Sequence, residues 1–319
     1  MKQYTIGIEV GGTNVRSALF DDDMQCVCTH HTATDSELTA EELVNLLAGH
    51  VRELMQTADV TSEQVRGVGA TFPSYIDYNQ GILLETSNIF SLNNVPIRDM
   101  LSNALNLPVW IDNNANAAAL AEHCMGAGRK HSSMVYVTIS TGVGSGLILN
   151  GQLFRGMHGM AGEIGHMFVS DSTGYPCGCG VTGCVQSIAS GASMARYAME
   201  RIKEGVESRI LDYAGTFSRI DMIAVGKAYS EGDPLAKEVV ERGAEYLGRM
   251  FRSINMILDV NVFVCGGGVM KLGDAFMQKI IQSYRRYSLT ESRFPSSFLK
   301  AELGERAGVI GAALLIPRE

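Results

Sequence analysis

Glycine-rich turns between β-strands are the feature that most constrains the fold of this chain. A β-rich segment, Tyr4–Val10, meets the turn Gly11–Thr13 and resumes as a strand over Val15–Phe20. The second half repeats this order, because the strand Met134–Ser140 meets the turn Thr141–Gly146 before a returning strand. Two equivalent units predict a duplicated α/β architecture. A dinucleotide-binding Rossmann motif needs a helix after its glycines, so that class is disfavoured.

Composition excludes several other classes of protein. The chain has 319 residues with 46% hydrophobic and 19% charged side chains, which is typical of a globular protein. A net charge of −8 disfavours nucleic-acid binding by bulk electrostatics. A long charge-free stretch, residues 131–154, contains a polar turn and does not resemble a membrane span. The N-terminus enters a strand without a signal-peptide pattern, so we expect a cytoplasmic protein that binds neither nucleic acid nor membranes.

Helix signals place the longer elements. Apolar residues at helical spacing predict a helix over Glu41–Met55. Asp233 and Pro234 form an N-cap and first-turn pair for a long helix. No low-complexity linker separates the halves, so we expect two lobes joined by a hinge around residues 112–117. Further strands are expected at Val65–Thr71, Val109–Asp112 and Val260–Cys265.

The glycine turns are candidate phosphate sites. Such turns expose converging backbone N–H groups that suit an anion, and Thr13, Ser140 and Thr141 add hydroxyl donors. Any single turn of this kind is better explained by a tight hairpin. Two of them across a cleft would hold a polyphosphate from both sides. The triple glycine Gly266–Gly268 would let an adenine ring or a ribose lie against bare backbone.

A cysteine cluster predicts a metal site. Cys177, Cys179 and Cys184 lie within eight residues, and His166 lies eleven residues upstream. Three thiolates and one imidazole complete a tetrahedral set, which is typical of a structural zinc site without an open position for catalysis. The alternative is three loop cysteines that bind no metal.

These motifs together resemble those of the ROK-family sugar kinases (repressor, open reading frame, kinase). The resemblance rests on Ile8–Thr13, Thr138–Gly146, Gly162–His166 with its cysteines, and Val264–Gly268, and it runs from residue 4 to about residue 316. It implies a two-lobed actin-like ATPase fold (ribonuclease H-like) with an interlobe cleft. The implied small N-terminal lobe comprises residues 1–115 plus 305–319, and the large C-terminal lobe with the zinc loop comprises residues 116–304. It also implies a homodimer or homotetramer.

The same resemblance implies that ATP with Mg²⁺ phosphorylates a hexose or a hexose derivative. Glu9 replaces the more common aspartate that orders the Mg²⁺ shell, and Gln186 replaces a glutamate that contacts the sugar. His166 would bind both zinc and sugar. The implied nucleotide-binding residues are Gly11, Gly12, Thr13, Ser140, Thr141, Gly142, Gly144, Gly266, Gly267 and Gly268, and the implied sugar-binding residues are Asn88, Asn113, Glu163, His166 and Gln186.

The position of the family's catalytic base holds an amide. The segment Asp112–Asn116 resembles the family's Glu/Asp-Asn-Asp-Ala-Asn motif, and the catalytic aspartate aligns with Asn114. An amide cannot accept the hydroxyl proton, and loss of a general base costs about 10²–10⁴-fold in rate. We interpret Asn114 as an engineered change that inactivates a sugar kinase. The alternatives are a natural, catalytically inert sugar-binding protein, or Asp112 acting as the base from the same face of the strand.

A sugar-responsive transcriptional regulator is the remaining alternative. Such ROK proteins carry a helix-turn-helix domain before the first glycine motif, which here begins within ten residues of the first residue. We therefore expect no DNA-binding domain. The sequence does not identify the sugar, because the family phosphorylates glucose, fructose, allose and N-acetylated hexosamines.

Overall fold

The structure, a computed structural model, describes residues 3–86, 92–171 and 174–317 of the chain. It contains two compact units. Unit 1 comprises Met1–Ser132, Gly146–Ala161 and Glu302–Glu319, and unit 2 comprises Ser133–Ser145 and Gly162–Ala301. These bounds differ from the division expected near residue 115, because the helix that follows this residue packs within unit 1 against the C-terminal helix.

Unit 1 is built on a five-stranded sheet with the order β3-β2-β1-β4-β8. The strand β1 pairs antiparallel with β2 and parallel with β4, and β4 pairs parallel with β8. A smaller sheet has the order β5-β6-β7. The strands are β1 (Tyr4–Val10), β2 (Asn14–Phe20), β3 (Cys26–Ala33), β4 (Val65–Phe72), β5 (Ser74–Asp77), β6 (Ile82–Thr86), β7 (Asn93–Val95) and β8 (Val109–Asn113).

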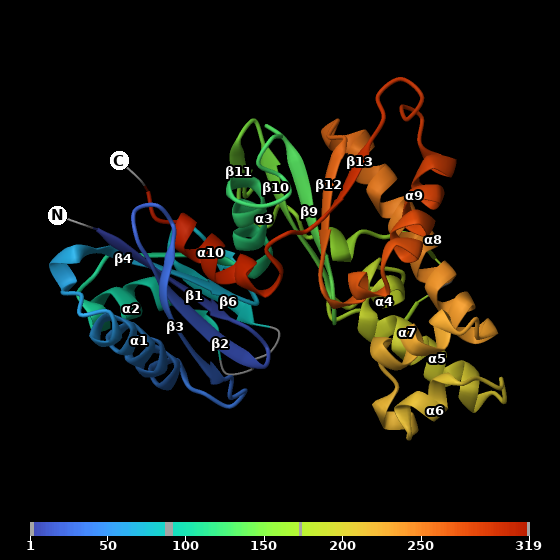
Figure 1. The fold of residues 1–319 in the computed structure, drawn as a ribbon, viewed down its shortest axis with the longest axis horizontal. Helices are drawn as coiled ribbons and strands as arrows, with labels where there is room; N and C mark the ends of the chain where they lie inside the picture. The colour runs from blue at the N-terminus through green and yellow to red at the C-terminus, as the bar shows by residue number, and fades with distance from the viewer. Residues whose placement is uncertain (1–2, 87–91, 172–173, 318–319) are drawn as a thin grey trace. The chain divides into compact units, whose positions relative to one another are not determined.

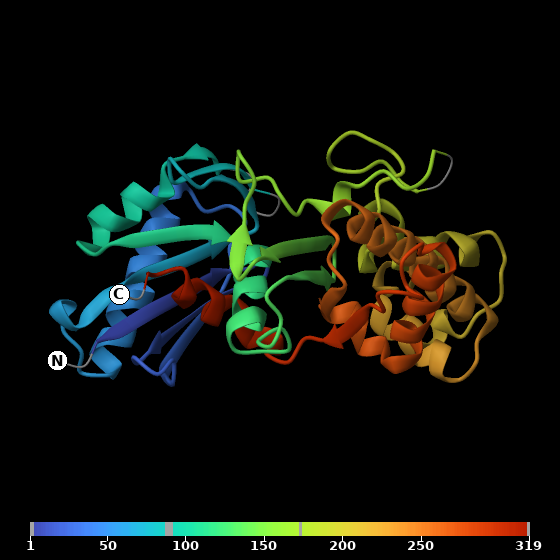
Figure 2. The same cartoon turned by 90° about the horizontal axis from the view of Figure 1, so that it is seen from above.

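Alternation along β1 determines which helices cover each face of this sheet. Ile6 and Ile8 are fully buried in the core formed with the helices α1 and α2. Gly7 faces the opposite side, where a side chain would overlap the backbone of α10 at Val309, so the helix packs directly on the strand. Figure 1 shows α1 over β3, and Figure 2 shows the red α10 beside the blue strands. The helical elements of unit 1 are α1 (Ala40–Thr57), η1 (Ser62–Gln64), α2 (Ile97–Leu105), α3 (Asn114–Cys124), η5 (Gly304–Arg306) and α10 (Ala307–Leu314).

The second five-stranded sheet has the order β11-β10-β9-β12-β13. The division between the units falls within β10, after Ser145. A hairpin is followed by parallel strands in both large sheets, which confirms the predicted duplication. Asn150 and Gly151 both have positive φ, as the predicted hairpin turn requires. The strands are β9 (Met134–Ile139), β10 (Val143–Leu149), β11 (Gln152–Phe154), β12 (Val262–Gly266) and β13 (Ser297–Lys300).

Helices α8 and α9 lie beside β12 (Figure 1), and each contributes an aromatic ring to a contact with Phe263 of that strand. Phe251 of α8 contacts Phe263 of β12 edge-on, with ring centroids 5.0 Å apart. The predicted start of α8 is confirmed, since the Asp233 side chain accepts the N–H of Ala236 at 2.8 Å. The helical elements of unit 2 are η2 (Ile164–His166), α4 (Gln186–Ala189), α5 (Gly191–Lys203), α6 (Ile210–Ala214), η3 (Phe217–Arg219), α7 (Met222–Ser230), α8 (Pro234–Leu258), η4 (Gly268–Leu272) and α9 (Asp274–Tyr287).

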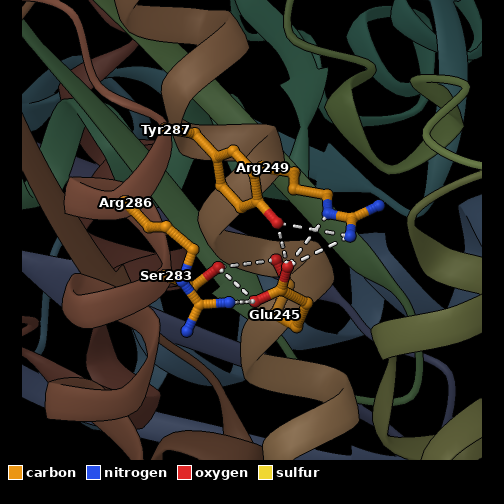
Figure 3. Close-up of polar contacts among 5 residues, drawn as sticks. All are labelled: Glu245, Arg249, Ser283, Arg286 and Tyr287. Carbon is orange, nitrogen blue, oxygen red and sulfur yellow. Dashed lines mark hydrogen bonds and ion pairs between the residues drawn. The ribbon is translucent and has the colours of Figure 1, made fainter.

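A charged cluster joins α8 to α9 (Figure 3). Glu245 of α8 accepts hydrogen bonds from the hydroxyls of Ser283, at 3.0 Å, and Tyr287. Arg249 and Arg286 approach the same carboxylate at 3.1 and 3.2 Å. Within the described residues, no helix is both long and apolar enough to cross a membrane.

Candidate functional site

A cavity of about 1170 Å³ in unit 2 contains part of the predicted nucleotide site. Ser140 and Thr141, from the turn between β9 and β10, line the cavity together with Gly268 of η4. The helices α5 and α7 supply most of its remaining wall, which is largely apolar. Those wall residues include Ala195, Met199, Met222, Ile223, Tyr229 and Leu272, as well as the cationic Arg196 and Lys271.

Close backbone contacts hold this glycine-rich wall in place. Gly267 has φ +93°, and a Cβ there would overlap the backbone of Ile139 at the end of β9. Only glycine fits that position without strain. The N–H of Gly191, at the start of α5, donates to the carbonyl of Ser140 at 2.7 Å. The start of α5, the β9–β10 turn and the glycine segment therefore meet at one place.

The other predicted nucleotide residues fall into two groups. In unit 2, Gly142 lies in the same turn as Thr141, Gly144 lies in β10, and Gly266 ends β12. In unit 1, the turn Gly11–Thr13 joins β1 to β2 and is closed by the N–H of Gly11, which donates to the carbonyl of Asn14 at 2.8 Å. Gly12 and Thr13 are exposed in this turn, so their polar groups remain accessible to a ligand.

Glu9, the predicted Mg²⁺-associated residue, lies in β1 beside the first turn of α10. Burial raises the pKa of its carboxyl, although Arg16 at 3.6 Å opposes that shift. Gly308 makes room for the carboxylate, because a Cβ there would overlap it. The buried Oε2 of Glu9 accepts no hydrogen bond from the described residues. This oxygen faces Arg16 Nη1 at 3.6 Å, beyond hydrogen-bond distance, so it keeps acceptor capacity for the water shell of an Mg²⁺ ion.

The segment that carries the base position lies where β8 gives way to α3. Asn113 is the N-cap of α3, and its Oδ1 accepts the N–H of Asn116 at 2.8 Å. Asn114 is the first residue of the helix, and its Nδ2 donates to the carbonyl of Val10 at 2.9 Å. Its Oδ1 is buried and has no hydrogen-bond partner among the described residues. Because the amide donates to the Val10 carbonyl, its oxygen is the atom left for a ligand.

The carboxylate of Asp112, the alternative base considered from the sequence, is already engaged by three neighbouring residues. The carboxylate is buried and pairs with Arg155 at 2.6 Å, and it accepts Nδ2 of Asn116 at 2.8 Å and the N–H of Asn113 at 2.8 Å. Asn114 begins a helix and does not continue β8, so the expected shared strand face does not exist. Arg155 was not identified from the sequence, because no local spacing links two residues that are 43 positions apart.

The four residues predicted to bind zinc lie together in unit 2 and could hold a metal ion. The ligand atoms of His166, Cys177, Cys179 and Cys184 all lie within 4.8 Å of one another. Cys179 Sγ lies 3.6 Å from Cys184 Sγ, and Cys177 Sγ lies 3.4 Å from His166 Nδ1. A tetrahedron with Zn–S bonds of about 2.3 Å has edges of roughly 3.8 Å, so these spacings fit a zinc ion. Burial lowers the pKa of His166, which favours the neutral imidazole that binds metal.

Gln186 of α4 contacts this cluster directly. Its Nε2 donates to Cys177 Sγ at 3.2 Å and lies 3.5 Å from His166 Nε2. Glu163 lies just before η2, and burial raises the pKa of its carboxyl. Three of the predicted sugar-binding residues therefore lie within residues 163–186 of unit 2, the stretch that holds the four cluster residues and that we term the zinc segment. Asn113 lies in unit 1, and Asn88 lies outside the described residues.

These features define a class of protein: an α/β chain with a nucleotide-sized cavity at glycine-rich turns and a zinc-type Cys₃His cluster beside polar side chains. The family model described as "ROK family" matches residues 5–319. The chain belongs to the ROK family.

Named relatives and a solved structure agree with this assignment. The chain is 33% identical to a glucokinase of Halalkalibacterium halodurans, over 99% of this chain and 96% of that protein. It is 31% identical to an N-acetylmannosamine kinase of Escherichia fergusonii, over 99% of both proteins. A ROK family glucokinase from Streptomyces griseus, solved in complex with glucose and AMPPNP, superposes with a TM-score of 0.83 at 32% identity, covering 98% of this chain and 99% of that one. The fold is therefore that of the actin-like ATPases, as the sequence predicted.

Proposed function

We propose that this protein binds ATP and a hexose at a sugar-kinase site whose catalytic base is replaced by Asn114. The observation that carries the proposal is the cavity in which the Ser140–Thr141 turn meets Gly268. A flat base and ribose would lie against the glycine segment, and the phosphates would lie at the turn. The glucokinase relative, and the Streptomyces griseus glucokinase in complex with glucose and AMPPNP, support the same ligand pair.

The polar residues divide into three proposed roles. Gly11–Thr13 and Ser140–Gly144 would donate N–H and hydroxyl groups to the phosphates. When bound, Mg²⁺ would neutralise charge on the phosphoryl groups, and Glu9 would hold its water shell. Asn113, Glu163, His166 and Gln186 would bind the sugar hydroxyls, and Asn88 is proposed for the same role from the family match alone.

Position 114 decides whether the bound sugar can react. A sugar hydroxyl that attacks the terminal phosphoryl group must lose its proton, and a carboxylate normally accepts that proton. Asn114 Oδ1 can accept a hydrogen bond from the hydroxyl but is not basic. The position lies at the N-terminus of α3, where the helix dipole would stabilise an ionised aspartate. We therefore propose binding without efficient phosphoryl transfer.

The test restores the base. Asn114→Asp is assayed for ADP release with glucose, fructose, allose, N-acetylglucosamine and N-acetylmannosamine, and we expect turnover to rise about 10²–10⁴-fold with one sugar of this panel. Asn114→Ala is the matched control, because it removes the amide without adding a base. If Asn114→Asp binds the sugar but releases no ADP with any of the five, and adding Gln186→Glu does not restore release, the kinase assignment is wrong.

A natural, inert sugar-binding protein is the second candidate, and Gln186 favours it. Here a second amide occupies a position where the family has a carboxylate, and it donates to a cysteine of the zinc cluster. If a single engineered change inactivated the chain, Asn114→Asp alone restores turnover. If the chain is naturally inert, only the pair Asn114→Asp with Gln186→Glu does so. Gln186→Glu alone is the control and stays inactive under both hypotheses.

We also propose a cytoplasmic homodimer or homotetramer, from the family resemblance. Light scattering of the purified protein measures the mass of the assembly directly. A monomer at micromolar concentration would contradict that part of the proposal.

A further inference from the structure

Arg196 connects the proposed nucleotide cavity with the zinc segment. It lies on α5 and lines the cavity together with Ser140, Thr141 and Gly268. Lys271 is the other cationic side chain among the lining residues. The lining as a whole is largely apolar and includes Met199 of α5 and Phe217 of η3, which is surface suited to a flat ring.

One face of the Arg196 guanidinium is already occupied. Its central carbon lies 3.9 Å from the ring centroid of Tyr175, in cation–π geometry. Glu200 completes the arrangement, because its two carboxylate oxygens accept Nε of Arg196 at 3.0 Å and the hydroxyl of Tyr175 at 2.7 Å. The hydrogen bonds of the described residues leave the terminal nitrogens of Arg196 available, and about half of the side chain is exposed (52%).

Tyr175 belongs to the zinc segment. It lies two residues before Cys177, and its N–H donates to the carbonyl of Ser187 at 3.2 Å. Tyr175 precedes the cysteines, and its hydrogen-bond partner Ser187 follows them. A movement of Arg196 would therefore displace a ring whose backbone is bonded across the cysteine cluster.

The position of Arg196 along α5 indicates which part of a nucleotide it would meet. The helix starts at Gly191, whose N–H is bound to Ser140 in the phosphate turn. Arg196 is five residues further along, or about 7–8 Å at 1.5 Å per residue. This rise separates the backbone of Arg196 from the Ser140 turn, and its side chain lines the same cavity. The open face of an arginine also stacks well on aromatic rings.

We propose that Arg196 is a nucleobase-binding residue, held between the base and Tyr175, and that it couples nucleotide binding to the zinc segment. The inference rests on the proposed function, because it takes the cavity to be a nucleotide site. Coupling is reciprocal: if nucleotide stabilises the Arg196–Tyr175 stack and hence the zinc segment, zinc release slows when nucleotide binds.

The first experiment compares two ligands by calorimetry. ADP carries a base and inorganic triphosphate does not. Arg196→Met is expected to raise the Kd for ADP about fivefold, the size of one exposed cation–π contact, and to leave the Kd for triphosphate within about twofold. Arg201→Met is the matched control on the same helix, since Arg201 pairs with Glu204 and does not line the cavity. Arg196→Lys keeps the charge without the planar group and is expected to lie between parent and Arg196→Met.

The second experiment measures the rate of zinc release to a coloured chelator, with and without saturating ADP. In the parent protein we expect ADP to slow release about fivefold or more. This protection should be lost in Arg196→Met and in Tyr175→Leu, which removes the stacked ring without touching the cavity. If Arg196 had a merely structural role, Arg196→Met would change the rates of zinc release with and without ADP equally, and the ratio of the two rates would stay as in the parent.

The outcomes separate this inference from the proposed function. If the parent protein does not bind ADP, both fail. If the parent binds ADP and Arg196→Met binds it equally well, only the inference fails. Equal weakening of ADP and triphosphate assigns Arg196 to the phosphates and overturns the nucleobase contact. If the rate of zinc release from the parent protein is the same with and without ADP, the proposed coupling is wrong.

Discussion

Asp112 and Arg155 form an ion pair at 2.6 Å, although 43 residues separate them in the sequence. The carboxylate is buried at the end of β8, and the guanidinium also stacks on Tyr78 with 4.0 Å between its carbon and the ring centroid. Asp112 in turn receives hydrogen bonds from Asn113 and Asn116. The pair therefore holds the segment that carries Asn114 and fixes the chain where it leaves β11.

Removal of Arg155 should destabilise unit 1. Arg155→Met leaves a buried carboxylate without its cation, which costs about 3–5 kcal/mol of unfolding free energy. Denaturant unfolding followed by the fluorescence of Trp110, two residues before Asp112 in β8, measures the change. The double variant Arg155→Met with Asp112→Asn should recover most of that loss. Equal stability of Arg155→Met and parent would show that the pair contributes nothing.

Zinc should be bound in a ratio of about one ion per chain, as a closed Cys₃His set requires. Cys184→Ser is expected to lose most of the bound zinc and to lower the melting temperature. The buried sulfur of Cys184 would link the end of the cysteine loop, through the metal, to the ligands that precede it in the chain. Elemental analysis after gel filtration measures the content. Cys265→Ser is the control, since its buried thiol lies outside the cluster. Full zinc content in Cys184→Ser would contradict the ligand assignment.

Stability of unit 1 should fall with pH because of His50. The buried ring lies between the hydroxyls of Ser17, 2.9 Å from Nδ1, and Thr32, 3.0 Å from Nε2. Burial, together with His30 and His31, lowers the pKa of His50 to about 4. The unfolded chain binds this proton near pH 6.5 and the folded chain does not, so stability is complete above pH 6.5 and is lost as the pH falls toward 4.

The measurement is the unfolding free energy between pH 4 and pH 7. One group of this kind contributes a slope of at most about 1.4 kcal/mol per pH unit. His50→Gln cannot be protonated and should flatten the profile, whereas the exposed His158→Gln should leave it unchanged. A parallel profile for His50→Gln and parent would assign the pH dependence to other groups.

The Glu245 cluster should stabilise the packing of α8 on α9 (Figure 3). Glu245→Gln keeps the size of the side chain but weakens its bonds to Ser283, Arg286 and Tyr287, and we expect a loss of about 2 kcal/mol in the unfolding free energy of unit 2. Glu241 is a matched control one turn earlier on α8. It pairs with Lys279 of α9 but is exposed, so Glu241→Gln should cost less than about 1 kcal/mol. Equal losses would show that burial of Glu245 does not matter.

Local sequence signals predicted the elements that local chemistry decides. The Asn150–Gly151 turn needs two residues that tolerate positive φ, and Asp233 caps a helix that begins at a proline. The cluster of three cysteines and one histidine could also be predicted from the sequence. Its members lie close together along the chain, and this pattern of cysteines and histidine is typical of a metal site. In each case the residues that determine the structure are neighbours along the chain.

The tertiary structure alone decided what the remaining polar side chains contact. Asp112 is as compatible with a catalytic base as with a buried ion pair until the fold brings Arg155 to it. The amide of Asn114 points its donor at Val10, and Arg196 meets Tyr175 across two segments that no spacing connects. A sequence motif indicates which side-chain functional groups one segment of the chain contains. Which of them are already satisfied depends on partners that only the packing of distant segments supplies, because burial makes every unsatisfied polar group costly.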